Sequence, residues 1–152
     1  MQNRAMFFRA LLAFLALPGM VAFALPGLWL WSQEAALVQP LGLYLLLIGV
    51  AALLSCVRDF YLRGRGTLAP WAPPEKLVVG GLYRFSRNPM YVVVLLILLG
   101  WAWAFASTPL WIYAACVALA FHLRVVFGEE PWLAKRYGQA WTDYASQVRR
   151  WL

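Results

Sequence analysis

The sequence has very few of the residues that usually bind metals. Of its 152 residues only one is histidine and two are cysteine. The single histidine, His122, excludes a site built from several histidines, and Cys56 and Cys116 lack the close spacing of metal-binding cysteines. Both cysteines lie in apolar runs, so we interpret them as small buried hydrophobic residues. We therefore expect no metal cofactor.

Charged residues are also scarce. They make up 12% of the chain and hydrophobic residues 64%, whereas soluble domains average about 25% and about 45–50%. A soluble domain of this length could not bury so much apolar surface. The composition predicts one all-α integral membrane domain over residues 1–152. Nine tryptophans and seven tyrosines suit the aromatic belts at membrane interfaces.

Uncharged runs predict four transmembrane helices, because one crossing needs about 20 apolar residues. The expected spans are residues 10–31, 37–57, 90–106 and 110–127. Pro18 and Pro26 should kink the first span or end it early, which membrane helices tolerate when neighbours satisfy the freed carbonyls. Its uncharged run of 24 residues is longer than a typical signal-peptide core, so we expect a retained span. Pro109, within a Ser-Thr-Pro turn, should separate the last two spans.

The basic residues predict the orientation in the membrane. The connections at residues 32–36 and 107–109 contain no Lys or Arg, and all thirteen basic residues lie elsewhere. By the positive-inside rule both termini are cytoplasmic, and we expect a bacterial inner membrane. The net charge of +7 then faces anionic lipid headgroups and needs no nucleic-acid partner.

Two cytoplasmic segments are expected. The loop at residues 58–87 should be irregular, because it contains Gly64, Gly66, Pro70, Pro73, Pro74, Gly80 and Gly81. Within it, Trp71 suits the headgroup layer. In the tail, apolar residues recur at spacings near 3.6, which predicts an amphipathic helix over residues 131–151. Pro131 suits its first turn, and the helix should lie on the inner leaflet or cap the bundle.

A polar stretch at residues 80–91 precedes the third span. Asn88 is expected as the N-cap of that span with Pro89 at its first position, which by itself explains the pair. It does not explain Tyr83, Arg87 and Tyr91 beside the same helix start. A helix N-terminus with free N–H groups next to arginines is suited to an anionic group.

Glu129-Glu130 is the only adjacent acidic pair, and we expect it to face the polar stretch. The pair could simply complement the dipole of the tail helix. At a membrane edge, however, unpaired carboxylates are costly, so a cationic partner is expected: Arg84, Arg87, Arg124 or a cationic ligand. Arg124 could extend to the headgroups or bind a carboxylate or phosphate from within the bundle. For His122 a structural hydrogen bond is the expected role.

These residues resemble a known family. Gly-Leu-Tyr-Arg-Phe-Ser-Arg-Asn-Pro-Met-Tyr at 81–91, Glu-Glu-Pro-Trp-Leu at 129–133 and Arg-Tyr-Gly at 136–138 with Tyr144 are similar to motifs of integral membrane methyltransferases. That family includes isoprenylcysteine carboxyl methyltransferases and phospholipid N-methyltransferases. Gly66-Thr67-Leu68-Ala69-Pro70-Trp71 resembles small bacterial members. The resemblance covers residues 64–152, and many members carry histidine at the position of Asn88.

The resemblance implies S-adenosylmethionine as methyl donor and a membrane lipid or other lipophilic molecule as acceptor. The residues that it places around the donor are Leu77, Val78, Gly81, Tyr83, Arg87, Asn88, Pro89, Met90, Tyr91, Glu129 and Glu130. It also implies that Arg124 orients the acceptor. A carboxylate acceptor needs no base, whereas an amine acceptor must lose a proton, for which Glu129 or Glu130 is the candidate.

A non-catalytic scaffold or assembly subunit with the same fold is the main alternative. A transporter is disfavoured, because ionisable residues are almost absent away from the cytoplasmic edge, whereas transport pathways carry them near the midplane. The sequence indicates neither the acceptor nor the oligomeric state.

Overall fold

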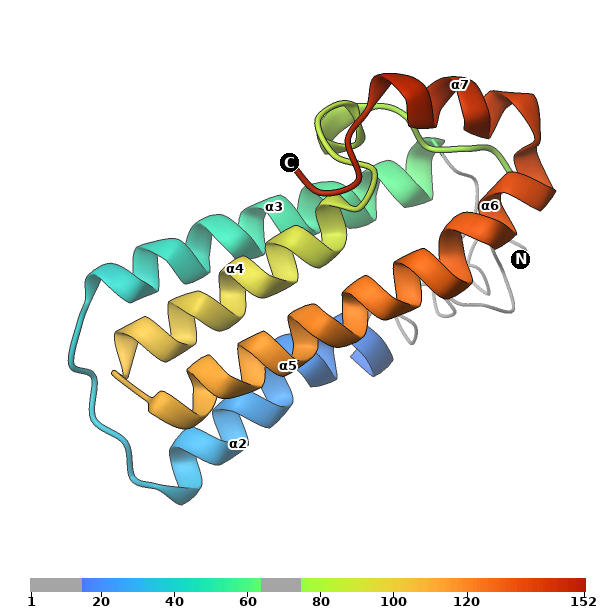
Figure 1. Cartoon of the computed structure of the whole chain (residues 1–152). Helices are drawn as coiled ribbons and strands as arrows, with labels where there is room; N and C mark the ends of the chain where they lie inside the picture. The colour runs from blue at the N-terminus through green and yellow to red at the C-terminus, as the bar shows by residue number, and fades with distance from the viewer. Residues whose placement is uncertain (1–14, 64–74) are drawn as a thin grey trace, which may run out of the picture.

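The computed structural model describes residues 15–63 and 75–152, and within these ranges it is all-helical, as predicted (Figure 1). The segments are η1 (Leu15–Ala24), α2 (Leu25–Ser32), α3 (Leu41–Arg63), η2 (Gly81–Arg84), α4 (Pro89–Ala104), α5 (Thr108–Arg124), η3 (Val125–Glu129), α6 (Glu130–Tyr137) and α7 (Gln139–Gln147). The start of the expected first span, the Gly66–Trp71 motif and the other glycines and prolines of residues 64–74 lie outside the described residues.

Helix α4 is the centre of the bundle. It packs along α3 on one side and α5 on the other, and η1 also contacts it (Figure 1). Its buried side chains meet Leu53 of α3 and Ala114 of α5 in one apolar cluster. The members from α4 are Val93, Val94, Ile97 and Leu98. This core fixes the α4 N-terminus, where the polar stretch of residues 80–91 ends.

Small residues bring α3 and α4 close together. A Cβ atom placed on Gly42 would lie 2.4 Å from the Ala104 nitrogen, and one on Gly100 would lie 2.8 Å from the Leu46 nitrogen. Such distances are below van der Waals contact, so only glycine fits. Close backbone approach through small residues is typical of helix pairs in membranes.

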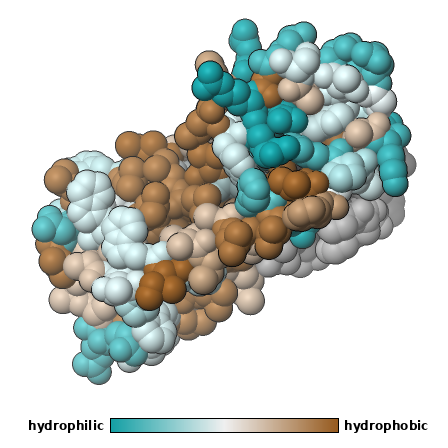
Figure 2. Space-filling model, in the orientation of Figure 1, coloured by the Kyte–Doolittle hydropathy of each residue, from teal (hydrophilic) through white to brown (hydrophobic). Residues whose placement is uncertain are grey.

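Two helical runs are long and apolar enough to cross a membrane, at Leu41–Asp59 and Thr108–Tyr137, while α4 at Pro89–Ala104 is shorter. Only 22% and 17% of their apolar windows are buried, so both runs turn most of their apolar surface outward. Hydrophobic side chains accordingly cover the middle of the face shown in Figure 2, and hydrophilic ones gather at the end with α6 and α7. These outward-facing apolar surfaces suit a membrane location.

In the first helical run, neighbouring helices satisfy the carbonyl groups left without a donor by Pro26, as expected from the sequence. Pro26 has no N–H to donate to the carbonyl of Ala22, one helical turn earlier. The Trp101 indole donates to that carbonyl at 3.0 Å, and the Tyr113 hydroxyl donates to the neighbouring Val21 carbonyl at 3.1 Å. Side chains of α4 and α5 therefore satisfy the carbonyls freed by the proline.

The tail differs from the single helix predicted for residues 131–151. Helix α5 continues through the π-turn η3 into α6, so Pro131 does not begin a new helix. The π-turn lies directly before this proline and accommodates its missing N–H. The break comes instead at Gly138, whose φ of +52° favours glycine. Helix α7 then caps the bundle, with Trp141 and Tyr144 buried beneath it.

Candidate functional site

The N-terminus of α4 has the predicted boundary but a different use of the Asn88 side chain. Asn88 is the N-cap and Pro89 stands in the first turn, yet no side-chain hydrogen bond caps the helix. The Asn88 amide instead donates to the Arg150 carbonyl at 3.0 Å. The start of α4 therefore keeps uncapped backbone N–H groups beside Arg87.

Glu129 is held from two helices. The Tyr91 hydroxyl donates to Glu129 Oε1 from α4, and Arg124 Nε donates to the same oxygen at 2.8 Å. The side chains of Arg124 and Glu129 are 51% and 31% exposed, so this part of the site stays accessible. Tyr91 is fixed by Phe121, whose ring centroid is 4.3 Å away.

The π-turn η3 makes the Arg124–Glu129 contact possible. At 3.6 residues per turn, two residues five apart in an α-helix point in directions about 140° apart. The wider turn over Val125–Glu129 reduces this angle and brings the two side chains to one side. Such single π-turns are frequent at functional sites.

Glu130 contacts two guanidinium groups. Arg150 donates from Nε to Oε1 at 2.9 Å and from Nη2 to Oε2 at 2.8 Å. Arg87 Nη1 lies 3.1 Å from Oε1, and the Glu130 side chain is only 15% exposed. Arg87 also lies over the Trp141 ring, 5.6 Å from its centroid. Its Nε is buried and has no hydrogen-bond partner among the described residues.

The C-terminal residues close over the polar stretch. The Arg87 backbone N–H donates to the Arg149 carbonyl at 2.9 Å, and the Ser86 hydroxyl donates to the Arg150 carbonyl at 3.3 Å. The Tyr144 hydroxyl donates to the Tyr83 carbonyl at 2.7 Å. Burial raises the pKa of Tyr144 to about 12, so its hydroxyl remains a donor at neutral pH.

Asp59, which the sequence analysis missed, supports the glycine pair. It is 2% exposed and forms an ion pair with Arg63 at 3.4 Å. A Cβ atom on Gly81, whose φ is +63°, would lie 1.9 Å from Asp59 Oδ2, and one on Gly80 would lie 1.7 Å from Arg63 Nη1. The ion pair therefore lies flat against this turn. An acid in the last turns of an apolar helix, four residues before an arginine, was the available signal.

The structure divides the predicted site residues into two groups. Arg87, Tyr91, Arg124, Glu129 and Glu130 come together in one charged cluster, which we call the inner cluster. Of the others, Val78 and Tyr83 lie in the apolar core and Met90 packs against it, Asn88 and Pro89 begin α4, Gly81 lies against Asp59, and Leu77 is half-buried.

Tyr83 lies in the apolar core. It is 6% exposed, and burial raises the pKa of its phenol well above the usual value. Its hydroxyl therefore stays protonated at neutral pH.

Of the cationic partners expected for the acidic pair, Arg87 and Arg124 contact it and Arg84 does not, and the structural hydrogen bond expected for His122 is not found among the described residues. Arg84 is exposed and forms no ion pair with a described residue, so it does not neutralise the acidic pair. His122 is exposed, and its ring lies 6.0 Å from that of Trp151. No described residue hydrogen-bonds to the His122 side chain.

The inner cluster, together with Arg150, combines both signs of charge. Three guanidinium groups meet two carboxylates there, so one positive charge is left over. Among the described residues no group of three or more His, Cys, Asp or Glu side chains could hold a metal ion. The donor set therefore suits a zwitterionic or anionic organic ligand.

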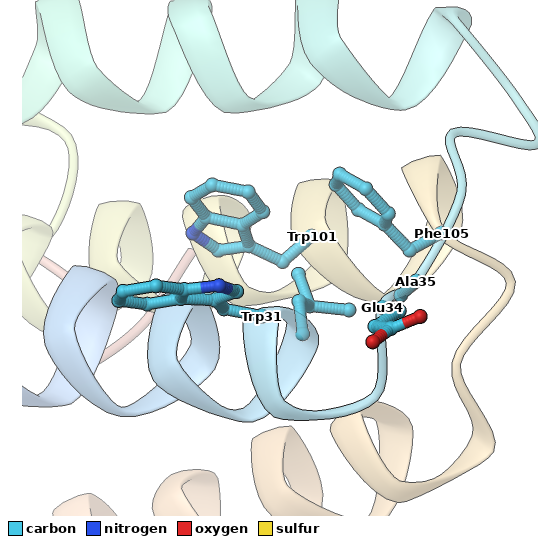
Figure 3. Close-up of a pocket in the computed structure, with 7 residues that line it drawn as sticks. Trp31, Glu34, Ala35, Trp101 and Phe105 are labelled. Carbon is cyan, nitrogen blue, oxygen red and sulfur yellow. The ribbon is translucent and has the colours of Figure 1, made fainter.

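A hollow of about 310 Å³ lies at the opposite end of the bundle (Figure 3). The rings of Trp31 of α2 and Trp101 of α4 lie next to one another there, and Glu34 lies to one side of both (Figure 3). Its remaining lining is Gly27, Leu30, Ala35 and Phe105. With one ionisable residue at its edge, it lacks the groups that gather in the inner cluster, and we place the candidate site at the cluster.

Comparison with known proteins relates most of the chain to one family. A family model described as phospholipid methyltransferase matches residues 37–140, from just before α3 to the start of α7. An uncharacterised protein of Haemophilus influenzae is 32% identical over 63 residues, which is 41% of this chain and all of that protein. No solved structure matches the chain.

Proposed function

Because the chain belongs to the phospholipid methyltransferase family, we propose that it transfers a methyl group from S-adenosylmethionine to a lipid-like or small hydrophobic acceptor. The observation that carries this proposal is the convergence of two distant motifs. Residues 87–91 and 129–130 meet through the Tyr91–Glu129 and Arg87–Glu130 contacts. Neither contact is needed to build an apolar bundle.

The residues present fit the chemistry of the donor. S-adenosylmethionine carries a carboxylate, an ammonium and a sulfonium, and when bound it supplies an electrophilic methyl group on sulfur. The buried Arg87 Nε lacks a partner among the described residues, and no side chain caps the start of α4. Both features suit the carboxylate. Glu129 Oε1 accepts the hydrogen bonds from Tyr91 and Arg124. No described residue donates to Glu129 Oε2, so this oxygen suits the ammonium.

The two acids are proposed to act differently. Both oxygens of Glu130 accept hydrogen bonds from guanidinium groups, so its lone pairs are engaged and it holds Arg87 in place. Glu129 is then the better-placed base if the acceptor is an amine, and a carboxylate acceptor needs none. Arg124, half exposed beside Glu129, is proposed to orient the acceptor. Alignment of donor and acceptor away from water supplies the rest of the catalysis.

The remaining predicted residues are proposed to shape the donor pocket. Leu77, Val78, Gly81, Tyr83 and Met90 would form its apolar wall next to the start of α4. Val78 and Tyr83 already lie in the buried core, and Met90 packs against it. Asn88 has no titratable ring, so its proposed role is only to hold the backbone at the start of α4 through its side-chain amide.

We propose four membrane spans with both termini in the cytoplasm of a bacterial cell. The absence of Lys and Arg from residues 32–36 and 107–109 supports this orientation. The inner cluster then lies at the cytoplasmic face of the inner membrane. A polar donor would reach it from the cytosol and a lipophilic acceptor from the bilayer.

The test is calorimetric binding of S-adenosylmethionine to the detergent-purified protein. We expect micromolar binding by the wild type and at least about tenfold weaker binding by Glu129→Gln, a loss of roughly 1.4 kcal/mol or more. The control is Asp143→Asn, an exposed acid on α7 whose carboxylate accepts from Gln139; it should bind normally.

Equal affinity of wild type and Glu129→Gln would remove Glu129 from the donor site. Absence of binding by folded wild-type protein would overturn the methyltransferase proposal. It would favour the alternative, a non-catalytic scaffold or assembly subunit that keeps the family's fold.

A further inference from the structure

We propose that Arg150 is a positioning residue of the donor site, which it serves from the C-terminal segment by fixing both Glu130 and the turn at Asn88. This inference rests on the proposed function. The family match ends at residue 140, so the comparison gives Arg150 no role. The contacts of the residue itself carry the argument.

The side chain of Arg150 holds the Glu130 carboxylate at two points. Nε donates to Oε1 at 2.9 Å and Nη2 donates to Oε2 at 2.8 Å. A planar guanidinium that binds both oxygens fixes the plane of the carboxylate as well as its place. The terminal torsion of a glutamate is otherwise broad. The oxygen that Arg87 contacts at 3.1 Å is therefore kept in one position.

The backbone of Arg150 holds the other half of the site. Its carbonyl accepts from the Asn88 amide at 3.0 Å and from the Ser86 hydroxyl at 3.3 Å. The preceding carbonyl, of Arg149, accepts the Arg87 backbone N–H at 2.9 Å. The C-terminal segment thus fixes the turn from which the Arg87 side chain extends.

These contacts make Arg150 a bridge between two elements. Glu130 begins α6 and Asn88 precedes α4, and Arg150 touches the first with its side chain and the second with its carbonyl. Arg87, whose buried Nε is the proposed donor contact, lies between them. Without the two hydrogen bonds from the Arg150 guanidinium, Glu130 keeps only Arg87 as a guanidinium partner. The side chains of Glu130 and Arg87 are then free to rotate. The expected result is weaker donor binding, with turnover at saturating donor changed less.

Arg149 provides a matched control. It carries the same charge in the same segment, its side chain is exposed, and its contact with the site is made by its carbonyl, which a substitution keeps. Arg149→Gln therefore removes one positive charge at the same end of the protein without removing a contact to Glu130. A general electrostatic effect would weaken donor binding in both variants equally.

The experiment is a calorimetric titration of the full-length protein with S-adenosylmethionine, for wild type, Arg150→Gln, Arg150→Lys and Arg149→Gln. The melting temperature of each variant is measured in parallel without donor. We expect Arg150→Gln to raise the donor Kd at least about tenfold and Arg149→Gln to change it less than about twofold. Arg150→Lys should fall between them, because an ammonium keeps the charge but not the two-point contact.

Each other outcome overturns the inference. Wild-type affinity in folded Arg150→Gln would assign Arg150 to stability alone. Wild-type affinity in Arg150→Lys would show that a positive charge suffices without the two-point guanidinium contact. If Arg150→Gln does not fold, the donor affinity of Arg150→Lys decides between the two outcomes. Failure of the wild type itself to bind would overturn the proposed function first, an outcome distinct from a loss confined to Arg150 variants.

Discussion

Glu129 and Glu130 are neighbours in the chain but have different surroundings. Glu129 is 31% exposed and contacts a tyrosine and an arginine, whereas Glu130 is 15% exposed and contacts two arginines. Successive residues of a helix point about 100° apart, so one acid faces the start of α4 near Tyr91 and the other faces Arg87. The pair therefore consists of a more accessible acid, Glu129, and a more enclosed one, Glu130.

At this scale Arg124 gives the sharpest prediction. We expect Arg124→Gln to lower kcat by about tenfold or more while the donor Kd changes by less than about threefold, because its guanidinium is proposed to orient the acceptor. Steady-state kinetics with both substrates varied, together with donor calorimetry, measures the two effects.

Arg84→Gln is the control for Arg124, because Arg84 is exposed and forms no ion pair with a described residue. It should leave kcat and donor affinity unchanged. If Arg124→Gln weakened donor binding as much as turnover, Arg124 would belong to the donor site rather than to the acceptor site.

At the scale of elements, prolines and glycines decide where the helices change course. Both π-helical segments of the described chain, η1 and η3, end two residues before a proline, at Pro26 and at Pro131. The first proline is accommodated by side chains that donate to the freed carbonyls. The second π-turn also brings Arg124 to Glu129. A local hydrogen-bonding adjustment thus contributes to the geometry of the site.

The α3–α4 contact can be tested by replacing a glycine at the contact with alanine and comparing it with the same replacement elsewhere. Gly100→Ala should lower the free energy of unfolding by about 1–3 kcal/mol, because its Cβ would lie 2.8 Å from the Leu46 nitrogen. Gly27→Ala is the matched control, since no atom lies within 4 Å of a Cβ there. Alanine also favours the helix by about 1 kcal/mol, so this variant should be as stable as wild type or more so.

Thermal unfolding in the same detergent compares the two glycine variants. Equal stability of Gly100→Ala and Gly27→Ala would show that α3 and α4 do not need their close approach. The α3–α4 packing described above would then be wrong.

The sequence predicts α4 and α5 well because their signals are local, whereas α3, expected at residues 37–57, begins at Leu41 and continues to Arg63, into the loop expected to be irregular. Apolar length and the Asn88-Pro89 and Ser-Thr-Pro boundaries place α4 and α5 within a few residues of their observed bounds. The meeting of residues 87–91 with the acidic pair was also predicted. The break at Gly138, the continuous helix through Pro131 and the Arg150–Glu130 contact were not. These features depend on contacts with residues distant in the chain and on the reach of a long arginine side chain. Neither leaves a periodic pattern in the sequence.

On the scale of the whole molecule, the two ends differ in chemistry. Every ion pair of the described residues lies at the end of the bundle that carries the inner cluster: Asp59–Arg63, Arg87–Glu130, Arg124–Glu129 and Arg150–Glu130. The other end carries the aromatic hollow of Trp31 and Trp101. Apolar side chains cover the middle of the face in Figure 2. This arrangement suits an enzyme that takes a polar donor from the cytosol and a lipophilic acceptor from the membrane.

The most direct measurement of the central claim is methyl transfer in liposomes made from bacterial lipid extract, with the purified protein and S-adenosylmethionine labelled on its methyl group. We expect label in the lipid fraction for the wild type and for Asp143→Asn, and a loss of at least about tenfold for Glu129→Gln. Absence of transfer by wild-type protein that binds the donor, or equal transfer by Glu129→Gln, would contradict the central claim.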